Sequence, residues 1–299
     1  MTLKLRWFRF YSFLMTRLPA LLGQRFRRKH HERIKQTISV RFFAKNYVPK
    51  IANLQPQTIS HETPETLWQY WAQGKDAAPE LVQACFRTAE KFCGQRKHVI
   101  VENKTLSHYT DLPAFIHDRF RSGRIGYAHF SDLVRLELLY RHGGYWSDAT
   151  NYMTGEIPQW IDELNFFVFH ALSGDCSYSF MQNCFIRSAK GAFLLDAWRT
   201  LCFEYWKSEN MAIDYFQHQL MFQTMIMNNV TAKKFYRQMP NMDQEPTHRL
   251  IKEKLYKKFD EEEFRHLTAN SFFQKLSHHN IPNKVSENSY YAHLIKLTL

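Results

Sequence analysis

The sequence predicts an α/β fold in which a mixed, mostly parallel sheet is flanked by helices, and three observations support this. Strand-like and helix-like segments alternate between residues 66 and 148, as expected for parallel strands joined by crossover helices. Two strand-like segments, residues 165–170 and 182–187, then follow one another and indicate a mixed sheet. The chain has 299 residues and is 44% hydrophobic, enough for a packed core.

Each predicted element has its own local signal. TLWQYW and HVIVE are short apolar runs typical of strands. Apolar residues recur at helical spacing after Pro79, which suits a first helical turn, and again up to Gly143 and Gly144, where glycine ends a helix. In chain order the elements are strand 66–71, helix 79–92, strand 98–102, helix 113–122, a helix ending at 143–144, strands 145–150, 165–170 and 182–187, and helices near 192–207 and 212–227. The last seventy residues are highly charged, and we assign no element to them.

Positive charge is concentrated in the first fifty residues. They hold 13 Lys or Arg residues and one acid, Glu32, whereas acids and bases balance over residues 51–299. Prolines punctuate the polar stretch NLQPQTISHETPE that follows, which is typical of a linker. The sequence therefore predicts a basic amphipathic segment over residues 1–55 and a folded domain over residues 56–299.

The N-terminal segment interleaves aromatic and basic side chains. Trp7 and Phe10 lie among Arg6 and Arg9, and a basic cluster occupies residues 25–29. Rings beside cations suit the headgroup region of an anionic bilayer, where each Lys or Arg contributes about 1 kcal/mol. The same composition also suits nucleic acid, and a solvated tail is a third interpretation. We favour an anionic membrane surface and expect no nucleic-acid partner.

Cysteine usage and hydropathy bear on the compartment. The five cysteines form no C-x-x-C pair, which argues against a disulfide framework and a cysteine-based zinc site. No apolar run approaches the length of about 18 residues that spans a membrane. The best N-terminal run, Phe10–Met15, is shorter than the apolar core of a secretory signal. We expect a cytoplasmic protein, peripheral at the inner face of the cell membrane.

The stretch RHGGYWSDATN carries the candidate site. Ligands of α/β sheets bind at the carboxyl ends of strands, and Asp148 lies near such an end. Alternation places Trp146 and Thr150 on the same face of the strand as Asp148. The glycine pair, Gly143 and Gly144, permits a tight turn and a close approach of backbone to a ligand.

A carboxylate and a guanidinium on the preceding helix add to this motif. Asp132 and Arg135 lie three residues apart and share a helix face. An aromatic ring, two carboxylates and a guanidinium together suit a nucleotide diphosphate. Taken singly, each feature has an ordinary alternative, such as a surface ion pair or a glycine cap. Their combination in one short segment favours a binding site.

SDLVRLELLYRHGGYWSDAT resembles the signature of GT-A-fold glycosyltransferases that carry a DXD-type motif. It is especially similar to the capsular polysaccharide synthesis protein family, and more distantly to the clostridial glucosylating toxins. The resemblance extends over roughly residues 64–250, through ETLWQYWAQGKDAAPELVQAC and EYWKSENMAIDYFQHQLMF. It implies a GT-A fold for residues 56–299 and transfer of a sugar from a nucleotide-sugar donor.

The resemblance also implies roles for single residues. Asp132 and Arg135 would contact the donor sugar, Trp146 would lie beside the nucleotide, and Asp148 would bind ribose and a metal ion, Mn²⁺ or Mg²⁺. The glycine pair completes the predicted donor site. The second aspartate of the motif is Thr150 here, as in many capsular members. Because a hydroxyl is a poorer ligand for a hard cation than a carboxylate, this difference weakens the expectation of strong metal dependence.

Residues further along the chain complete the predicted site. His248 is a candidate metal ligand or phosphate contact, with an ordinary surface histidine as the alternative. Asp214 and His218 lie four apart on a predicted helix. Family members carry a similar aromatic-rich Asp/His helix, which implies acceptor binding or base catalysis, although simple helix packing is the alternative. The predicted catalytic residues are therefore Asp148, Arg135, Asp214 and His218.

The sequence thus predicts a glycosyltransferase that builds a capsular or other surface polysaccharide. Its expected partners are a nucleotide-sugar donor, with a UDP-sugar favoured, and a glycan acceptor that is lipid-linked. The basic N-terminal segment would hold the enzyme near such an acceptor. The alternative is a membrane- or nucleic-acid-binding protein with an inactive transferase-like body, and the missing second aspartate of the motif favours it.

Overall fold

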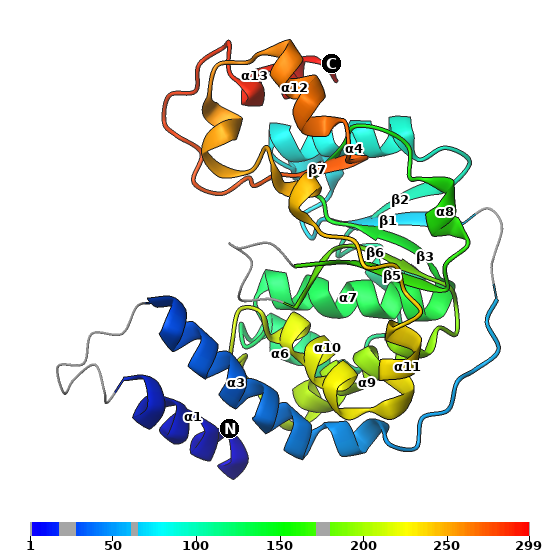
Figure 1. Ribbon diagram of the computed structural model, residues 1–299, viewed down its shortest axis with the longest axis vertical. Helices are drawn as coiled ribbons and strands as arrows, with labels where there is room; N and C mark the ends of the chain where they lie inside the picture. Colours follow the sequence, from blue (N-terminus) through cyan, green and yellow to red (C-terminus); the bar gives the residue numbers. More distant parts are fainter. Residues whose placement is uncertain (1, 18–27, 61–64, 172–179, 299) are drawn as a thin grey trace.

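The fold is mixed α/β. The structure is a computed structural model, which describes residues 2–17, 28–60, 65–171 and 180–298 (Figure 1). A five-stranded sheet has the order β2-β1-β3-β6-β5, and β4 and β7 form a separate antiparallel pair. The strands are β1 Thr66–Tyr70, β2 Lys97–Val101, β3 Gly144–Ser147, β4 Asn151–Met153, β5 Phe166–His170, β6 Met181–Ser188 and β7 Phe273–Lys275.

The direction of the strands confirms the predicted sheet. β1 pairs in parallel with both β2 and β3, whereas β6 runs antiparallel to β3 and β5. Four of the five strands therefore point the same way. The pair β5 and β6 makes the sheet mixed, as the two successive strand-like segments predicted.

Helices cover both faces of the sheet, with α4 above it in Figure 1 and α7 below it. The C-terminal helices α12 and α13 lie on the α4 side, and α6, α9 and α10 lie on the α7 side. The α-helices are α1 Leu3–Thr16, α3 Arg28–Asn46, α4 Glu80–Phe92, α5 Leu106–Tyr109, α6 Ala114–Arg121, α7 Tyr127–His142, α8 Gln159–Asp162, α9 Phe193–Ser208, α10 Gln217–Asn228, α11 Val230–Tyr236, α12 Glu261–Thr268 and α13 Tyr290–Lys296. Short 3₁₀ turns occupy Val48–Ile51, Lys75–Ala77, Glu245–His248 and Lys252–Tyr256.

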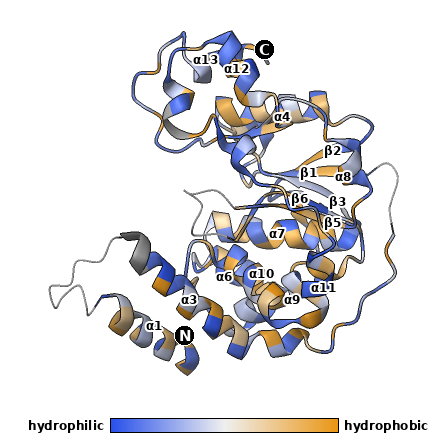
Figure 2. Ribbon diagram, in the orientation of Figure 1, coloured by the Kyte–Doolittle hydropathy of each residue, from blue (hydrophilic) through white to orange (hydrophobic). Residues whose placement is uncertain are grey.

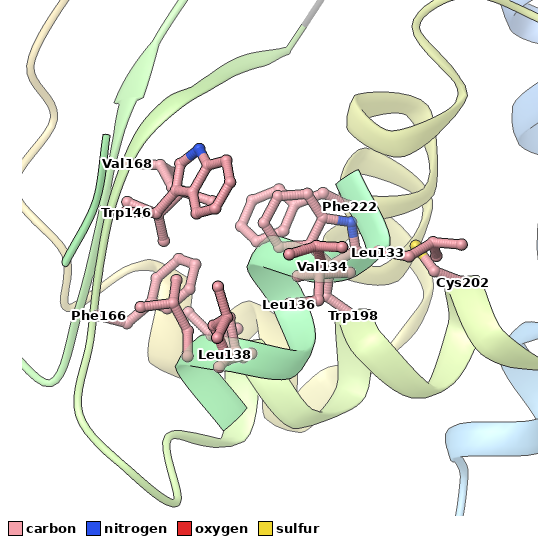
Figure 3. Packing of buried hydrophobic residues seen from close by; sticks show 14 of the residues in the cluster. Leu133, Val134, Leu136, Leu138, Trp146, Phe166, Val168, Trp198, Cys202 and Phe222 are labelled. Carbon is pink, nitrogen blue, oxygen red and sulfur yellow. The ribbon is translucent and has the colours of Figure 1, made fainter. Parts of the chain in front are cut away.

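The main core lies between the sheet and α7. Trp146 of β3 and Phe166 and Val168 of β5 face apolar residues of α7, with Trp198 of α9 and Phe222 of α10 behind them (Figure 3). Helix α7 is buried on nearly all sides, as expected for a helix enclosed between a sheet and a second helix layer. This packing fixes the position of α7 relative to the end of β3.

The glycine pair forms the connection between α7 and β3. Gly143 and Gly144 have φ angles of +70° and +93°, a region that side-chain-bearing residues rarely adopt. A Cβ atom on Gly144 would lie 2.3 Å from the carbonyl oxygen of Thr66 on β1. Glycine is therefore required here so that β3 can leave α7 and pair closely with β1.

The predicted helix 212–227 begins later than expected, at Gln217. The Asp214 carboxylate accepts a hydrogen bond of 2.9 Å from the backbone N–H of Phe216. Such a local side-chain bond competes with helix formation, so residues before Gln217 form a turn. Asp214 and His218 therefore do not share a helix, which corrects the prediction.

The N-terminal helices pack against the rest of the fold. Helix α3 lies along α10 (Figure 1), and its residue Phe43 joins the main core. Helix α1 packs on α3 through Leu5 and Phe8, which contact Ile38. Hydrophobic and hydrophilic residues are interleaved along α1 (Figure 2). The division at residue 55 stays a prediction, and residues 25–27 of the predicted basic cluster lie outside the described part.

The helices also differ from membrane-spanning segments. Within the ranges that the structure describes, no helix combines the length and apolar character that crossing a membrane requires.

Candidate active site

A cavity of about 430 Å³ opens at the carboxyl ends of β1 and β3. This is the edge at which α/β sheets bind ligands, and the volume suits a small molecule. Residues 70–73 at the end of β1 and residues 148–150 after β3 line it, together with residues of α7, β6, α10, the end of β7 and the segment that follows β7. The lining includes these residues with polar or charged side chains: Ser131, Asp132, Arg135, Asp148, Thr150, Asn183, Gln219, Lys275, His278 and His279.

Asp148 begins the turn between β3 and β4. Its backbone N–H donates to the carbonyl oxygen of Cys184 at 2.8 Å, and the Trp146 indole N–H donates to its Oδ1 at 2.8 Å. Arg135 approaches Oδ1 at 3.3 Å, and the Lys275 ammonium lies 3.0 Å from Oδ2. Burial alone would raise the pKa of Asp148, but Lys275 and Arg135 hold it below its ordinary value. The carboxylate is therefore ionised, fixed in orientation and 20% exposed toward the cavity.

Arg135 holds the two carboxylates in place. Its Nη2 lies 3.2 Å from Asp132 and 3.3 Å from Asp148, and Nη1 donates to the backbone carbonyl of Asn183. Its guanidinium carbon stacks 4.8 Å from the centre of the Trp146 ring. Only 6% of the side chain is exposed. Arg135 therefore orients its neighbours and presents little surface to a ligand.

Asp132 links this network to α10. Its Oδ1 accepts a hydrogen bond of 2.9 Å from Asn183, which also contacts Nδ1 of His218 at 2.9 Å. Burial would raise the pKa of Asp132, but His218 and Arg135 lower it, so that the net value lies well below the ordinary one. Burial lowers the pKa of His218 to about 3 despite the nearby carboxylate. His218 is thus neutral at physiological pH.

Lys275 reaches the cavity from the other end of the sequence. The antiparallel pairing of β4 with β7 sets Lys275 opposite Asn151, and the backbone N–H of Leu276 donates to the carbonyl oxygen of Thr150 at 2.8 Å. This register brings the ammonium next to Asp148 and lets it donate to the Thr150 hydroxyl. Burial would lower the pKa of Lys275, but Asp148 holds it above its ordinary value, so the side chain remains charged.

The structure brings five predicted residues to one place and leaves the others apart. Asp132, Arg135, Trp146, Asp148 and Thr150 all border the cavity. The glycine pair lies at the opposite end of β3, where its role is structural.

The two residues predicted to act on the acceptor lie away from the opening. The carboxylate of Asp214 pairs with Lys35 on α3 at 2.8 Å. His218 is 3% exposed and stacks on Trp198 with ring centres 4.0 Å apart. Neither side chain lines the cavity.

Trp146 is not positioned to stack on a nucleotide base. The ring is 1% exposed and belongs to the main core (Figure 3). Aromatic side chains with open faces lie elsewhere in the lining: Tyr215 is 71% exposed and Tyr127 is 60% exposed. These rings, rather than Trp146, are available for stacking.

The residues around Asp148 do not fit a divalent metal ion. Both carboxylate oxygens already face N–H or ammonium groups, and the Thr150 hydroxyl accepts a hydrogen bond from Lys275. Nδ1 of His248 contacts the hydroxyl of its neighbour Thr247 at 2.7 Å, and His248 does not line the cavity. Across the described ranges no three His, Cys, Asp or Glu side chains gather as a metal site would require.

Sequence reasoning missed Lys275, Asn183 and Tyr215. Lys275 lies in the charged C-terminal part, and the three-residue strand β7 is too short to give a periodic signal. Asn183 is in a predicted strand, but nothing in its neighbourhood marks it as a partner of Asp132. Tyr215 falls within the predicted helix 212–227, where an aromatic residue suggests packing, whereas the helix in fact begins after it.

These features define an α/β protein with a charged, ligand-sized cavity at the switch from parallel to antiparallel strands. A model of the capsular polysaccharide synthesis protein family matches residues 20–294. The chain therefore belongs to the capsular polysaccharide synthesis protein family. A solved structure titled "PaToxG Glycosyltransferase" is 12% identical, covers 69% of this chain and 83% of its own, and superposes with a TM-score of 0.42. No curated protein matches the chain.

Proposed function

We propose that this protein is a glycosyltransferase, which moves a sugar from a nucleotide-sugar donor to a growing capsular or other surface polysaccharide. The observation that carries the proposal is the ordered pair of ionised carboxylates, Asp132 and Asp148, held by Arg135 at the rim of the cavity. Membership of the family supports the same conclusion. A UDP-sugar is the proposed donor.

The carboxylates suit the hydroxyl groups of a donor. Asp148 is fixed by three donors yet remains partly exposed, so that a lone pair of the carboxylate is free to accept from a sugar or ribose hydroxyl. Fixing the acceptor atoms before the ligand binds reduces the entropy lost on binding. Arg135 acts indirectly, because its guanidinium orients both carboxylates.

The rim of the cavity suits the acceptor. Tyr127 and Tyr215 stand on α7 and on the turn before α10, and both rings are largely exposed beside the cavity. Exposed rings offer flat apolar faces together with a hydroxyl, a combination that suits a sugar ring. We assign the acceptor glycan to this side of the cavity.

An anionic membrane surface is the proposed location of the reaction. Helix α1 buries Leu5 and Phe8 against α3 while Trp7, Phe10 and Phe13 remain 64%, 55% and 47% exposed. Arginines stand among these rings, and the first fifty residues carry the excess positive charge of the chain. This combination suits insertion of rings at headgroup level without spanning the bilayer, close to a lipid-linked acceptor.

A donor screen tests the proposal. The melting temperature of the full chain is measured with UDP-, GDP- and CDP-sugars, each with EDTA and with Mn²⁺. We expect at least one nucleotide sugar to raise it, because a ligand that binds only the folded state stabilises that state. Absence of stabilisation by every donor would favour the alternative of an inactive transferase-like body.

A further inference from the structure

The feature that the proposed function leaves unexplained is a lysine beside its central carboxylate. The Lys275 ammonium lies 3.0 Å from Oδ2 of Asp148 and donates to the Thr150 hydroxyl. It therefore stands between the carboxylate and the threonine that occupies the second position of the motif. A metal ion ligated by those two residues would have to stand in the same space.

The position of Lys275 is set by backbone as well as by charge. Pairing of β7 with β4 and the hydrogen bond from Leu276 to Thr150 fix its Cα next to the turn that carries Asp148. The neighbouring Gln274 is fully buried and bonded to the backbone at Leu250 and Pro246. The ammonium is thus delivered by a rigid element and is not the end of a free surface chain.

Lys275 has more capacity for a ligand than Arg135, the guanidinium that also lines the cavity. All three guanidinium nitrogens of Arg135 have partners, and its side chain is 6% exposed. Lys275 is 21% exposed, and among the described residues it has two partners for three ammonium protons. One proton remains for an anion in the cavity.

Charge balance requires such a cation. Asp132 and Asp148 would repel a diphosphate bound beside them unless positive charge lay between. The lysine ammonium can contact phosphate oxygens while it remains beside the carboxylate. We infer that Lys275 supplies the positive charge that binds the diphosphate of the donor, in the place of a divalent metal ion. This inference rests on the proposed function.

The position of Lys275 also suits stabilisation of the leaving group, the nucleoside diphosphate. When the bond between the anomeric carbon and the β-phosphate oxygen breaks, the electron pair stays with that oxygen and the nucleoside diphosphate gains negative charge. A fixed ammonium beside the diphosphate stabilises this charge. The acceptor hydroxyl forms the new bond to the anomeric carbon, and its proton passes to the departing diphosphate oxygen, which holds the electron pair of the broken bond.

Calorimetric titration of the full chain with UDP, GDP and CDP, in EDTA and in Mn²⁺, tests the inference. For the nucleotide that binds, we expect affinities in the two buffers to agree within about threefold. Lys275→Met should bind about tenfold or more weakly in EDTA, the loss expected for a charge-assisted contact, and Lys275→Arg should retain most of the affinity. Mn²⁺ should partly rescue Lys275→Met, because the substitution frees Asp148 to ligate a metal.

The test includes a control variant and a comparison of wild-type binding in EDTA and in Mn²⁺. Lys207→Met removes an exposed lysine that pairs with Glu204 on α9, and it should bind like wild type. Binding that disappears in EDTA, or that survives in Lys275→Met, would overturn the inference while leaving the proposed function intact. No binding of any nucleoside diphosphate in either buffer would instead count against the proposed function itself. The EDTA comparison needs no variant, so it stands even if Lys275→Met folds poorly.

Discussion

At the scale of single residues, the site is a buried network in which each charge is matched. Asp132 and Asp148 share one guanidinium, and Lys275 neutralises the outer face of Asp148. Removing one member of a buried ion pair costs more than the pair contributes, because the partner is left buried without compensation. The network is therefore expected to stabilise the fold as well as to form the proposed binding site.

Arg135→Met should lower the free energy of unfolding by about 3 kcal/mol, since two poorly solvated carboxylates lose their shared cation. Urea denaturation followed by circular dichroism measures this. Arg121→Met, on α6, removes a 75% exposed side chain whose partner Asp118 is 64% exposed, and it should change stability by less than about 1 kcal/mol. Equal effects of the two substitutions would contradict the assigned role of Arg135.

His218 should make the fold sensitive to mild acid. Its pKa is about 3 in the folded protein and 6.5 for an unperturbed histidine, so the unfolded state binds more protons between these values. Stability is then full above pH 6.5 and falls as the pH decreases, by up to about 1.4 kcal/mol per pH unit. The melting temperature of His218→Phe should fall less than that of wild type as the pH is lowered from about 6.5 to about 4.5. If the melting temperatures of the two proteins fall equally as the pH is lowered, His218 does not determine the pH dependence of stability.

At the scale of elements, two connections position the site: the glycine turn from α7 into β3, and the ladder between β4 and β7. Each connection holds the backbone of one element close to that of its neighbour, Gly144 against Thr66 and β4 against β7. The side chains that follow each connection therefore have little freedom to move. A substitution in either connection should therefore act on the whole site without touching a ligand.

Gly144→Ala tests the first connection. The added Cβ would meet the Thr66 carbonyl oxygen at 2.3 Å on a backbone with φ +93°, so we expect a loss of more than about 1 kcal/mol in unfolding free energy. Gly126→Ala is the control, because its Cβ would meet nothing within 4 Å and its φ is −77°. Thermal unfolding that ranks the two variants equally would contradict the account.

Elements with long periodic signals were predictable from the sequence, and sites formed by long-range pairing were not. The helix that ends at the glycine pair and the strand that follows it placed Asp132, Arg135 and Asp148 near one another. Lys275 comes from a three-residue strand whose partner lies more than a hundred residues earlier, and no local pattern specifies such a pairing. The start of α10 was misplaced because a side-chain bond from Asp214 replaces a helical turn.

At the scale of the whole molecule, the basic N-terminal helices extend from the face of the fold that carries α9 and α10 (Figure 1). They are packed on the body and continue its core, yet the outer side of α1 leaves aromatic rings in solvent. An exposed apolar surface ringed by positive charge is expected to meet an anionic, apolar partner.

The variant Trp7→Ser with Phe10→Ser should reduce co-flotation with vesicles that contain anionic lipid by about tenfold, since two rings no longer enter the interface. High salt should weaken the remaining binding. The control, Met227→Ser with Val230→Ser, alters two exposed apolar residues elsewhere on the surface and should float like wild type. Unchanged flotation of the first variant would remove the membrane assignment.

We propose that a nucleotide sugar reacts beside Asp148. Release of nucleoside diphosphate from that donor, followed by anion-exchange chromatography, measures this reaction. With water or glycan as acceptor, wild type should release nucleoside diphosphate, and Asp148→Asn should be slower by about a hundredfold or more while its melting profile shows a folded protein. Lys91→Met, in a separate cavity of about 300 Å³, should react like wild type. Wild-type release by Asp148→Asn, or loss of release in Lys91→Met, would contradict the account.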